Sequence, residues 1–357
     1  MLRYTQFDEP VERHLVEGPL ATAGRRLKAG GVLSGALHTL GYYSTDVCLG
    51  SPPRCFDLIV DTGSSITAVP CSTCQKCGQH RCGSSGRFNT QGSSSASLVS
   101  CKKPPAGFNC EACGSSSACT YSVHYTEGSA IKGHVVTDVA HFSQAGLPQG
   151  PARELSTRVY FGCQTLETGM FYKQVADGIM GMQPPRARAR VPSMLFSLVR
   201  QEKAADAFSL CLSDTAGLLL LGGTPQPERI QRRGGLVVPM QRNARARYTL
   251  KLADVRASGA GRQNTSFASL RLGRDALAPT LVDSGTTFVY ASTPLYRALH
   301  AHIKAHAPPL ERVGNKVCAH LTPGQLGELP SLQLVFDAVP GSPLIVRPFQ
   351  CVGAGTS

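Results

Sequence analysis

One short pattern occurs twice in the chain and limits what the chain can fold into. At residues 58–64 an apolar run ends in Asp61 and continues with Thr-Gly-Ser, and at residues 281–287 an apolar pair ends in Asp283 and continues with Ser-Gly-Thr-Thr. An acid at the end of a buried strand is costly unless its oxygens have hydrogen-bond partners. The hydroxyl residues that follow each acid can supply them, so the sequence predicts one kind of site built twice.

Two aspartates brought together by such a repeat have a defined chemistry. Like charges a few ångströms apart cannot both ionise cheaply, so the pair shares one proton near working pH. One carboxylate can then act as general base on a water held between them, while the protonated one donates to a carbonyl. We therefore predict that Asp61 and Asp283 are catalytic. The residues after them are predicted to turn the backbone and to orient the carboxylates: Thr62, Gly63, Ser64, Ser284, Gly285 and Thr286.

The bulk composition is that of a mainly β protein. The chain has 357 residues, 42% of them hydrophobic, which is enough for a large core and about two domains. Short apolar runs punctuated by 37 Gly and 24 Pro favour β-strands. The net charge is +13, but a nucleic-acid-binding module would interleave basic and aromatic residues, and only 6% of the residues are aromatic and none is Trp. The charge is therefore interpreted as a solvated basic surface, with no nucleic-acid partner.

The 14 cysteines indicate an oxidising compartment. A glycosylation sequon at Asn264 fits a secretory route, although the first residues hold no apolar signal segment and no run of about twenty apolar residues offers a membrane span. Opposed cysteines on a hairpin favour a Cys48–Cys55 disulfide, and we also expect Cys163–Cys211 and Cys318–Cys351. The other eight lie in a Cys-, Gly- and Ser-rich insert, residues 71–119, and are expected to pair among themselves: Cys71, Cys74, Cys77, Cys82, Cys101, Cys110, Cys113 and Cys119.

Zinc is the alternative interpretation of the insert. Cys71, Cys74, Cys77 and Cys82 have plausible ligand spacings. We favour disulfides, and expect no metal and no cofactor. The spacing of His302 and His306 could place two metal ligands on one helix face, but no third ligand is evident. His300, His302 and His306 are therefore interpreted as surface residues.

Several motifs resemble the pepsin-type (family A1) aspartic endopeptidases. They are LIVDTGSS (58–65), ADGIMG (176–181), TLVDSGTT (280–287) and Tyr125 with Glu127-Gly128-Ser129. The likeness covers roughly residues 40 to 351. It implies a bilobal, mainly β fold with a long cleft, and a strand at 179–181 that supports Asp61. It also implies a flap that closes over a peptide, with substrate contacts from Tyr125, Glu127, Gly128 and Ser129.

Two further stretches narrow this likeness. The Cys-rich insert is similar to the nepenthesin-type insert, and FGCQTLETGMFYKQVADGIMGM (161–182) with YTEGSAIKG (125–133) resembles the plasmepsin V group of apicomplexan parasites, most nearly the coccidian members. That resemblance implies a protease of the endoplasmic reticulum or Golgi that cuts effector precursors at an Arg-x-Leu type motif. Glu127 is implied in gripping the substrate Arg. We expect a monomer that acts on peptides with a basic residue near the cleavage site, with membrane attachment only through a segment absent from this sequence.

The likeness also sets the expected domains. They are a pro-like or linker segment (1–40), an N-terminal lobe (41–205) with the insert and a flap at 121–136, and a C-terminal lobe (206–357). In the family, another apolar-apolar-Gly strand follows the second Asp, whereas this sequence stops before one. We therefore expect the C-terminal lobe to be truncated. The alternative is a catalytically inactive or truncated pepsin-fold protein that binds peptides or acts as an inhibitor; a zinc-dependent or nucleic-acid-binding module is least favoured.

Overall fold

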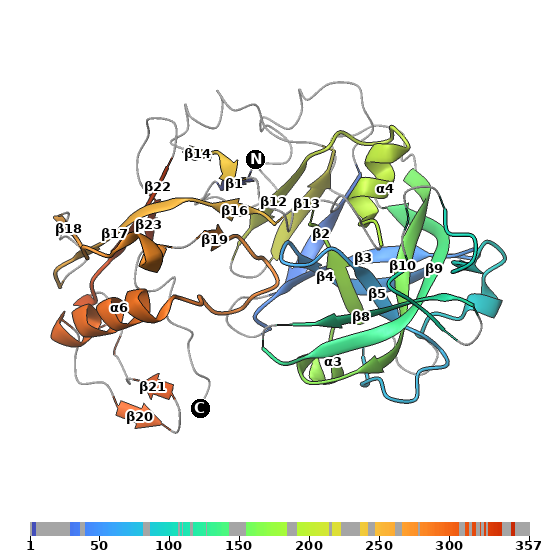
Figure 1. The fold of residues 1–357 in the computed structure, drawn as a ribbon, viewed down its shortest axis with the longest axis horizontal. Helices are drawn as coiled ribbons and strands as arrows, with labels where there is room; N and C mark the ends of the chain where they lie inside the picture. Colours follow the sequence, from blue (N-terminus) through green and yellow to red (C-terminus); the bar gives the residue numbers. More distant parts are fainter. Residues whose placement is uncertain are drawn as a thin grey trace.

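Strands make up most of the regular structure in the described part of the computed structural model (Figure 1). They form one large sheet, on the right of Figure 1, and several smaller ones, and helix α6 lies among the latter on the left. The structure describes residues 2–4, 29–35, 40–80, 86–105, 108, 110–114, 117–125, 127–142, 155–183, 191–213, 216–222, 236–241, 247–260, 266–277, 279–306, 311–313, 316–318, 322, 325, 328–337 and 344–346.

The large sheet joins 12 of the described strands. Strand β6 (Ser97–Leu98) pairs with β9 beside the main path. The order along that path is β12 (Phe208–Leu212), β13 (Ala216–Leu221), β2 (Ala29–Gly35), β3 (Tyr43–Leu49), β4 (Arg54–Asp61), β11 (Gly178–Gly181), β5 (Thr67–Pro70), β10 (Leu155–Glu167), β9 (Ala130–Phe142), β8 (Cys119–His124) and β7 (Ala112–Cys113).

Strand β4 delivers Asp61 from the middle of this sheet. It pairs antiparallel with β3 and parallel with β11, in a register that places Gly181 beside Asp61. Leu58 and Val60 pack into one hydrophobic cluster, and Ile59 packs into a second cluster. Successive side chains of a strand point to opposite faces, so both faces of β4 are buried. This is why the strand has a continuous apolar run instead of an alternating pattern.

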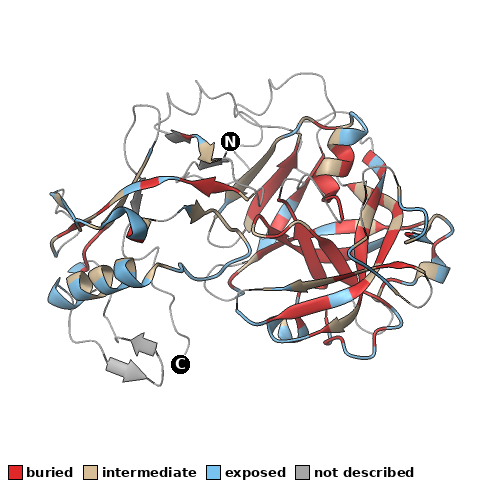
Figure 2. Ribbon diagram, in the orientation of Figure 1, coloured by how far each residue is buried: buried red, intermediate tan, exposed pale blue. Residues whose placement is uncertain are grey.

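The smaller sheets have fewer buried residues, as Figure 2 shows. Helix α6 (Thr293–His306) contains no buried residue, and Phe288, Val289 and Tyr290 just before it are exposed. The pairings are β1 (Leu2–Tyr4) with β14 (Leu236–Val238), β15 (Met240–Gln241) with β16 (Thr249–Leu250) and β19 (Thr280–Leu281), β18 (Phe267–Ser269) with β17 (Leu252–Ser258), β22 (Leu332–Phe336) and β23 (Leu344–Val346), and β20 (Glu311–Val313) with β21 (Lys316–Cys318).

The helical elements in the described residues are short apart from α6. Helix α4 begins after Ser193, whose hydroxyl accepts a hydrogen bond from the Phe196 N–H, as an N-cap residue does. None of these helices combines the length and the apolar character that crossing a bilayer requires. The other helical elements are α3 (Met170–Lys173), α4 (Met194–Arg200), η2 (Thr90–Gly92) and η3 (Arg274–Leu277).

Three strands belong to the large sheet although the sequence placed their residues outside the expected N-terminal lobe. Strand β2 falls in the expected linker segment, and β12 and β13 fall in the expected C-terminal lobe, yet all three extend the large sheet. The glycines of β2 resembled a linker, but they allow close packing. A Cβ on Gly30 would lie 2.5 Å from the Leu219 carbonyl oxygen of β13. The expected boundaries at 40 and 205 therefore do not separate the strands of this sheet.

The disulfides agree with the expected pairs in part. Cys48 and Cys55 lie opposite each other on β3 and β4 and form a disulfide, as expected. Within the insert the structure forms three bonds: Cys74–Cys77, Cys101–Cys113 and Cys110–Cys119. Cys82, Cys351 and Asn264 lie outside the described residues, and nothing is described of the Cys318 side chain.

The expected Cys163–Cys211 pair is wrong, and so is the expectation that the insert cysteines pair only with one another. Cys163 is bonded to Cys71, and Cys211 is a free cysteine. The parallel pairing of β5 with β10 places Cys163 beside Val69 and so brings the two sulfurs together. The zinc alternative also loses support, because Cys71, Cys74 and Cys77 are all in disulfides. The sulfurs of Cys101, Cys110 and Cys119 cluster within 4.8 Å of one another, but these cysteines are bonded too.

Removing the Cys71–Cys163 disulfide should destabilise the large sheet, because it joins cysteines that are 92 residues apart in sequence. For a Cys71→Ser/Cys163→Ala double variant we expect the free energy of unfolding to fall by about 3 to 5 kcal/mol in chemical denaturation. Cys211→Ala is the control and should cost less than about 1 kcal/mol. Equal losses in the two variants would contradict this pairing.

Candidate active site

The two aspartate loops hold each other through hydroxyl-to-backbone hydrogen bonds. Thr62 Oγ1 donates to the Val282 carbonyl oxygen at 2.9 Å and accepts from the Ser284 N–H at 2.9 Å. In return, Ser284 Oγ donates to the Val60 carbonyl oxygen at 2.6 Å and accepts from the Thr62 N–H at 3.1 Å. The residues after the two acids therefore join the β4 segment to a segment that lies 222 positions later.

Each carboxylate has the same pair of local donors. The Gly63 N–H donates to Asp61 Oδ1 at 2.7 Å, and the Gly285 N–H donates to Asp283 Oδ1 at 2.9 Å. The second oxygen, Oδ2, accepts from a hydroxyl three residues on, which is Ser64 in one loop and Thr286, at 2.7 Å, in the other. The hydroxyl three residues after each acid is thus its hydrogen-bond partner, whereas the hydroxyl directly after each acid binds the opposite loop.

The two glycines allow the carboxylates to approach. A Cβ on Gly285 would lie 2.5 Å from Asp61 Oδ1, and a Cβ on Gly63 would meet the Asp283 carboxylate. Real Cβ atoms do not approach an oxygen so closely, so each loop can pass the opposite acid only with glycine at this position. The structure therefore brings Asp61 and Asp283 together, with all six neighbours that the sequence singled out.

The two acids differ in burial. Asp61 is 4% exposed, whereas Asp283 is half-buried and residues 285–290 are exposed. Burial first, and then the negative charge of Asp283, raise the pKa of Asp61 to about 7, against the lowering effect of the Ser64 hydrogen bond. Because the folded state holds this proton more tightly than the unfolded chain, Asp61 lowers the free energy of unfolding as pH rises from 3.8 towards 7.

Strand β11 supports the first loop from behind. The Met182 N–H donates to the Asp61 carbonyl oxygen at 2.8 Å, and the Gln183 N–H donates to that of Ser64 at 2.9 Å. The side chain of Gln183 also donates to the Gly63 carbonyl oxygen. Tyr248, from the smaller sheets, donates its hydroxyl to the Met182 carbonyl oxygen at 2.8 Å. No motif marked Gln183 or Tyr248 in the sequence. Each donates to a backbone carbonyl oxygen, and such an acceptor does not depend on the type of residue that carries it.

The second acid has no matching support among the described residues. Among the described strands, β19, which leads to Asp283, pairs with β16 alone. Its loop is instead tied to the first part of the chain, where Thr287 Oγ1 donates to the Gly41 carbonyl oxygen at 2.9 Å. The expected truncation of the C-terminal lobe stays a prediction.

The hairpin of β8 and β9 carries an aromatic side chain to the two acids. The Tyr125 N–H donates to the Ser129 carbonyl oxygen at 2.9 Å, and Gly128 turns the chain with φ +95°, in the left-handed region that favours glycine. The Tyr125 hydroxyl is buried, and its pKa is raised by burial and then by the negative charge of Asp61. Glu127 is exposed at the tip of this hairpin. Ser129 is buried, and its hydroxyl oxygen accepts a hydrogen bond from the Met170 N–H.

Comparison with known proteins agrees with this geometry. The family described as Xylanase inhibitor N-terminal matches residues 43–223, more than half of the chain. Over 205 residues the chain is 33% identical to Aspartic protease 5 of Toxoplasma gondii, and over 195 residues it is 30% identical to Plasmepsin V of Plasmodium falciparum. Aspartic proteinase 39 of Arabidopsis thaliana is 29% identical over 285 residues. The chain belongs to the family of pepsin-like aspartic proteases.

The match covers only part of each relative. It includes 54% of this chain and 20% of the Toxoplasma protein, 54% of this chain and 30% of the Plasmodium protein, and 76% of this chain and 55% of the Arabidopsis protein. The chain thus spans between about a fifth and about half of the length of these pepsin-like relatives. Its disulfides and these relatives fit a protein of the secretory pathway. Its activity, substrates and partners are proposals.

The Ser64 hydroxyl should set the proton affinity of Asp61. In Ser64→Ala we expect the pKa of Asp61 to rise further above about 7, because a hydrogen bond that favours the ionised form is lost. The measurement is an NMR titration of the labelled carboxyl carbon. Ser65→Ala is the matched control, since the hydrogen bonds that shift the pKa of Asp61 come from Ser64, Asp283 and Gly63 and not from Ser65. An unchanged pKa in Ser64→Ala, or an equal rise in Ser65→Ala, would contradict this role.

Proposed function

We propose that the chain carries the active site of an aspartic endopeptidase, with Asp61 and Asp283 as the catalytic pair. The observation that carries the proposal is that two carboxylates with matching hydrogen-bond donors face each other, and that the pKa of one of them is raised to about 7. Such a pair holds one proton across the weakly acidic range. Two of the relatives named above, Aspartic protease 5 and Aspartic proteinase 39, are aspartic proteases by name.

The proposed reaction follows from the shared proton. The ionised carboxylate takes a proton from water, whose oxygen attacks the peptide carbonyl carbon, while the protonated carboxylate gives its proton to the carbonyl oxygen. One hydroxyl of the tetrahedral intermediate then returns its proton to the ionised carboxylate, the C–N bond breaks, and the leaving nitrogen takes a proton from the other carboxylate, so the pair again holds one proton. Tyr125 would cover the substrate, since its hydroxyl is buried near Asp61. The chain needs no nucleophilic side chain and no metal for these steps.

The proposed substrates are secretory or effector precursor proteins with an Arg-x-Leu type motif, cleaved in the endoplasmic reticulum or Golgi. The support is the likeness to Plasmepsin V and the carboxylate of Glu127, which is exposed at the flap tip and free to meet an Arg side chain. The proposed partners are peptides with a basic residue near the cleavage site. A catalytically inactive, inhibitor-like role on the same fold is less consistent, because both acids are present with their donors.

Peptide cleavage should depend on both acids and on the shared proton. In Asp61→Asn and Asp283→Asn we expect kcat to fall about a thousandfold or more. In the unchanged chain, kcat/KM should fall as pH rises through about 7, because Asp61 then loses the proton that the pair shares. The measurement is hydrolysis of a quenched peptide across pH, with exposed Asp46→Asn as the control. Full activity in Asp61→Asn would sink the proposal.

Glu127 should select for Arg in the substrate. For Glu127→Gln we expect kcat/KM on an Arg-x-Leu peptide to fall about tenfold, because a charge-assisted hydrogen bond is lost, with little change on the matched Ala-x-Leu peptide. Glu328→Gln, at an exposed acid that precedes β22, is the control. Equal losses on the two peptides would count against this role.

A further inference from the structure

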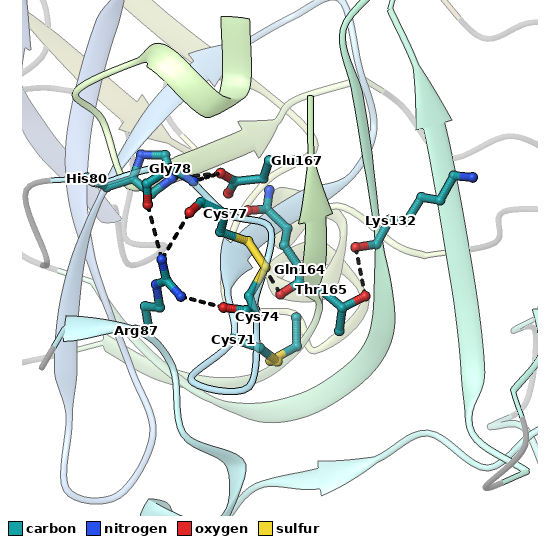
Figure 3. Close-up of a disulfide and its surroundings, with 11 residues drawn as sticks. Cys71, Cys74, Cys77, Gly78, His80, Arg87, Lys132, Gln164, Thr165 and Glu167 are labelled. Atoms are coloured by element: carbon teal, nitrogen blue, oxygen red, sulfur yellow. Dashed lines mark hydrogen bonds and ion pairs between the residues drawn. A yellow bond between two sulfur atoms is a disulfide. The ribbon is translucent and has the colours of Figure 1, made fainter. Parts of the chain in front are cut away.

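A buried ion pair lies between the Cys-rich insert and the end of β10, outside the two aspartate loops (Figure 3). His80 Nε2 is 2.8 Å from Glu167 Oε2, and the two side chains are 0% and 1% exposed. The Gly78 N–H donates to the same carboxylate oxygen at 2.9 Å. Burying two charges is unfavourable unless they are well paired and further hydrogen-bonded, as they are here.

The geometry favours the doubly protonated imidazolium form of His80. Its Nε2 faces the carboxylate of Glu167, and its Nδ1 lies 3.2 Å from the Gln174 carbonyl oxygen. Both partners are acceptors, and only the imidazolium donates from both nitrogens. Burial lowers the pKa of His80, but the hydrogen bond and charge of Glu167, the Gln174 carbonyl and the charge of Asp177 outweigh it. The pKa therefore lies above its ordinary 6.5. The charges that act on His80 are those of Glu167 and Asp177, and the Arg87 guanidinium binds the carbonyl oxygens of the same loop.

The insert loop that presents His80 is held on its other side. The Arg87 guanidinium donates to the carbonyl oxygens of Cys77 and Gly78, at 3.1 and 3.2 Å, and to that of Cys74 (Figure 3). The Cys74–Cys77 disulfide closes the same turn. The backbone N–H of Glu167 also donates to the Lys76 carbonyl oxygen at 2.9 Å. His80 is thus presented by a firmly held loop.

The residues directly after Glu167 hold the base of the flap. The Thr168 N–H and hydroxyl oxygen bond the carbonyl and N–H of Ala130, both at 2.9 Å. The Met170 N–H donates to Ser129 Oγ at 2.9 Å. The Phe171 ring then packs against the Tyr125 ring, with centroids 4.8 Å apart. A continuous run of contacts therefore leads from the ion pair to the aromatic residue over the two acids.

We propose that His80 and Glu167 are positioning residues: their buried ion pair fixes the segment 167–171, and through it places Tyr125 over the carboxylate pair. This inference rests on the proposed function. When His80 loses a proton, one of its nitrogens no longer donates, and the segment loses a contact that holds it. Deprotonation of His80 should therefore weaken peptide binding by the flap, whereas deprotonation of Asp61 stops the chemistry itself.

The absence of Trp from the chain allows a direct reading of flap position. In a reporter chain, Tyr125→Trp supplies the single Trp and Asp61→Asn removes the titration of Asp61. Adding His80→Gln or Glu167→Gln should shift the Trp emission to longer wavelength, as the ring becomes exposed. Adding His141→Gln, at the far end of β9, should not. The reporter chain itself should show the same shift as pH rises from 6.5 through the raised pKa of His80. At lower pH, His80 stays protonated and its ion pair with Glu167 stays intact.

The kinetic arm uses chains with Tyr125 and Asp61 intact, assayed below pH 6.5 on a quenched Arg-x-Leu peptide. For His80→Gln and Glu167→Gln we expect KM to rise about tenfold and kcat to change less than about twofold, a split that general loss of folded protein would not produce. Emission and KM equal to those of His141→Gln would overturn the proposal. If His80→Gln does not fold, the pH titration of the reporter chain decides: a Trp emission that does not shift with pH would overturn the proposal. If the unchanged chain cleaves no peptide, the proposed function fails, and the emission arm still decides the positioning role.

Discussion

The closeness of two carboxylates that repel each other is the constraint on which the rest of the site depends. Asp61 and Asp283 come from distant segments, and each carries its own N–H and hydroxyl donors. What holds them together is the exchange of hydrogen bonds between Thr62 and Ser284, each of which serves as donor and acceptor for the opposite backbone. Gly63 and Gly285 lack the Cβ atoms that would collide with the opposite carboxylate. The raised pKa of Asp61 is the electrostatic consequence of this packing.

The sequence was most informative where structure depends on neighbouring residues. Each acid, the glycine two residues on and the hydroxyl three residues on lie within four positions of one another, so their hydrogen bonds could be predicted from the motif. The hairpin disulfide Cys48–Cys55 is equally local. The apolar run of β4 also predicted a buried strand, because a strand that is buried on both faces is apolar at successive positions.

The sequence failed where the outcome depends on distant pairing. The partner of Cys163 is decided by the parallel contact of β5 and β10, which no local pattern encodes. Strand β2 was missed because glycines that permit close strand packing look like those of a linker. His80 and Glu167 lie 87 positions apart and carry no motif, and only the folded chain shows that both are buried. Gln183 was likewise invisible, because it binds a backbone carbonyl oxygen.

The reciprocal bonds between the two loops also bear on the order in which the site can be made. Chains begin to fold from the N-terminal side during synthesis. The strands from β2 to β13 can assemble the large sheet and place Asp61 before Ser284 has left the ribosome. Until then the Thr62 side chain has no opposite backbone to bind, and Asp61 has no second acid beside it. A nascent chain thus completes its carboxylate pair late. By then most of its own peptide bonds lie in folded structure and are protected from cleavage by the pair.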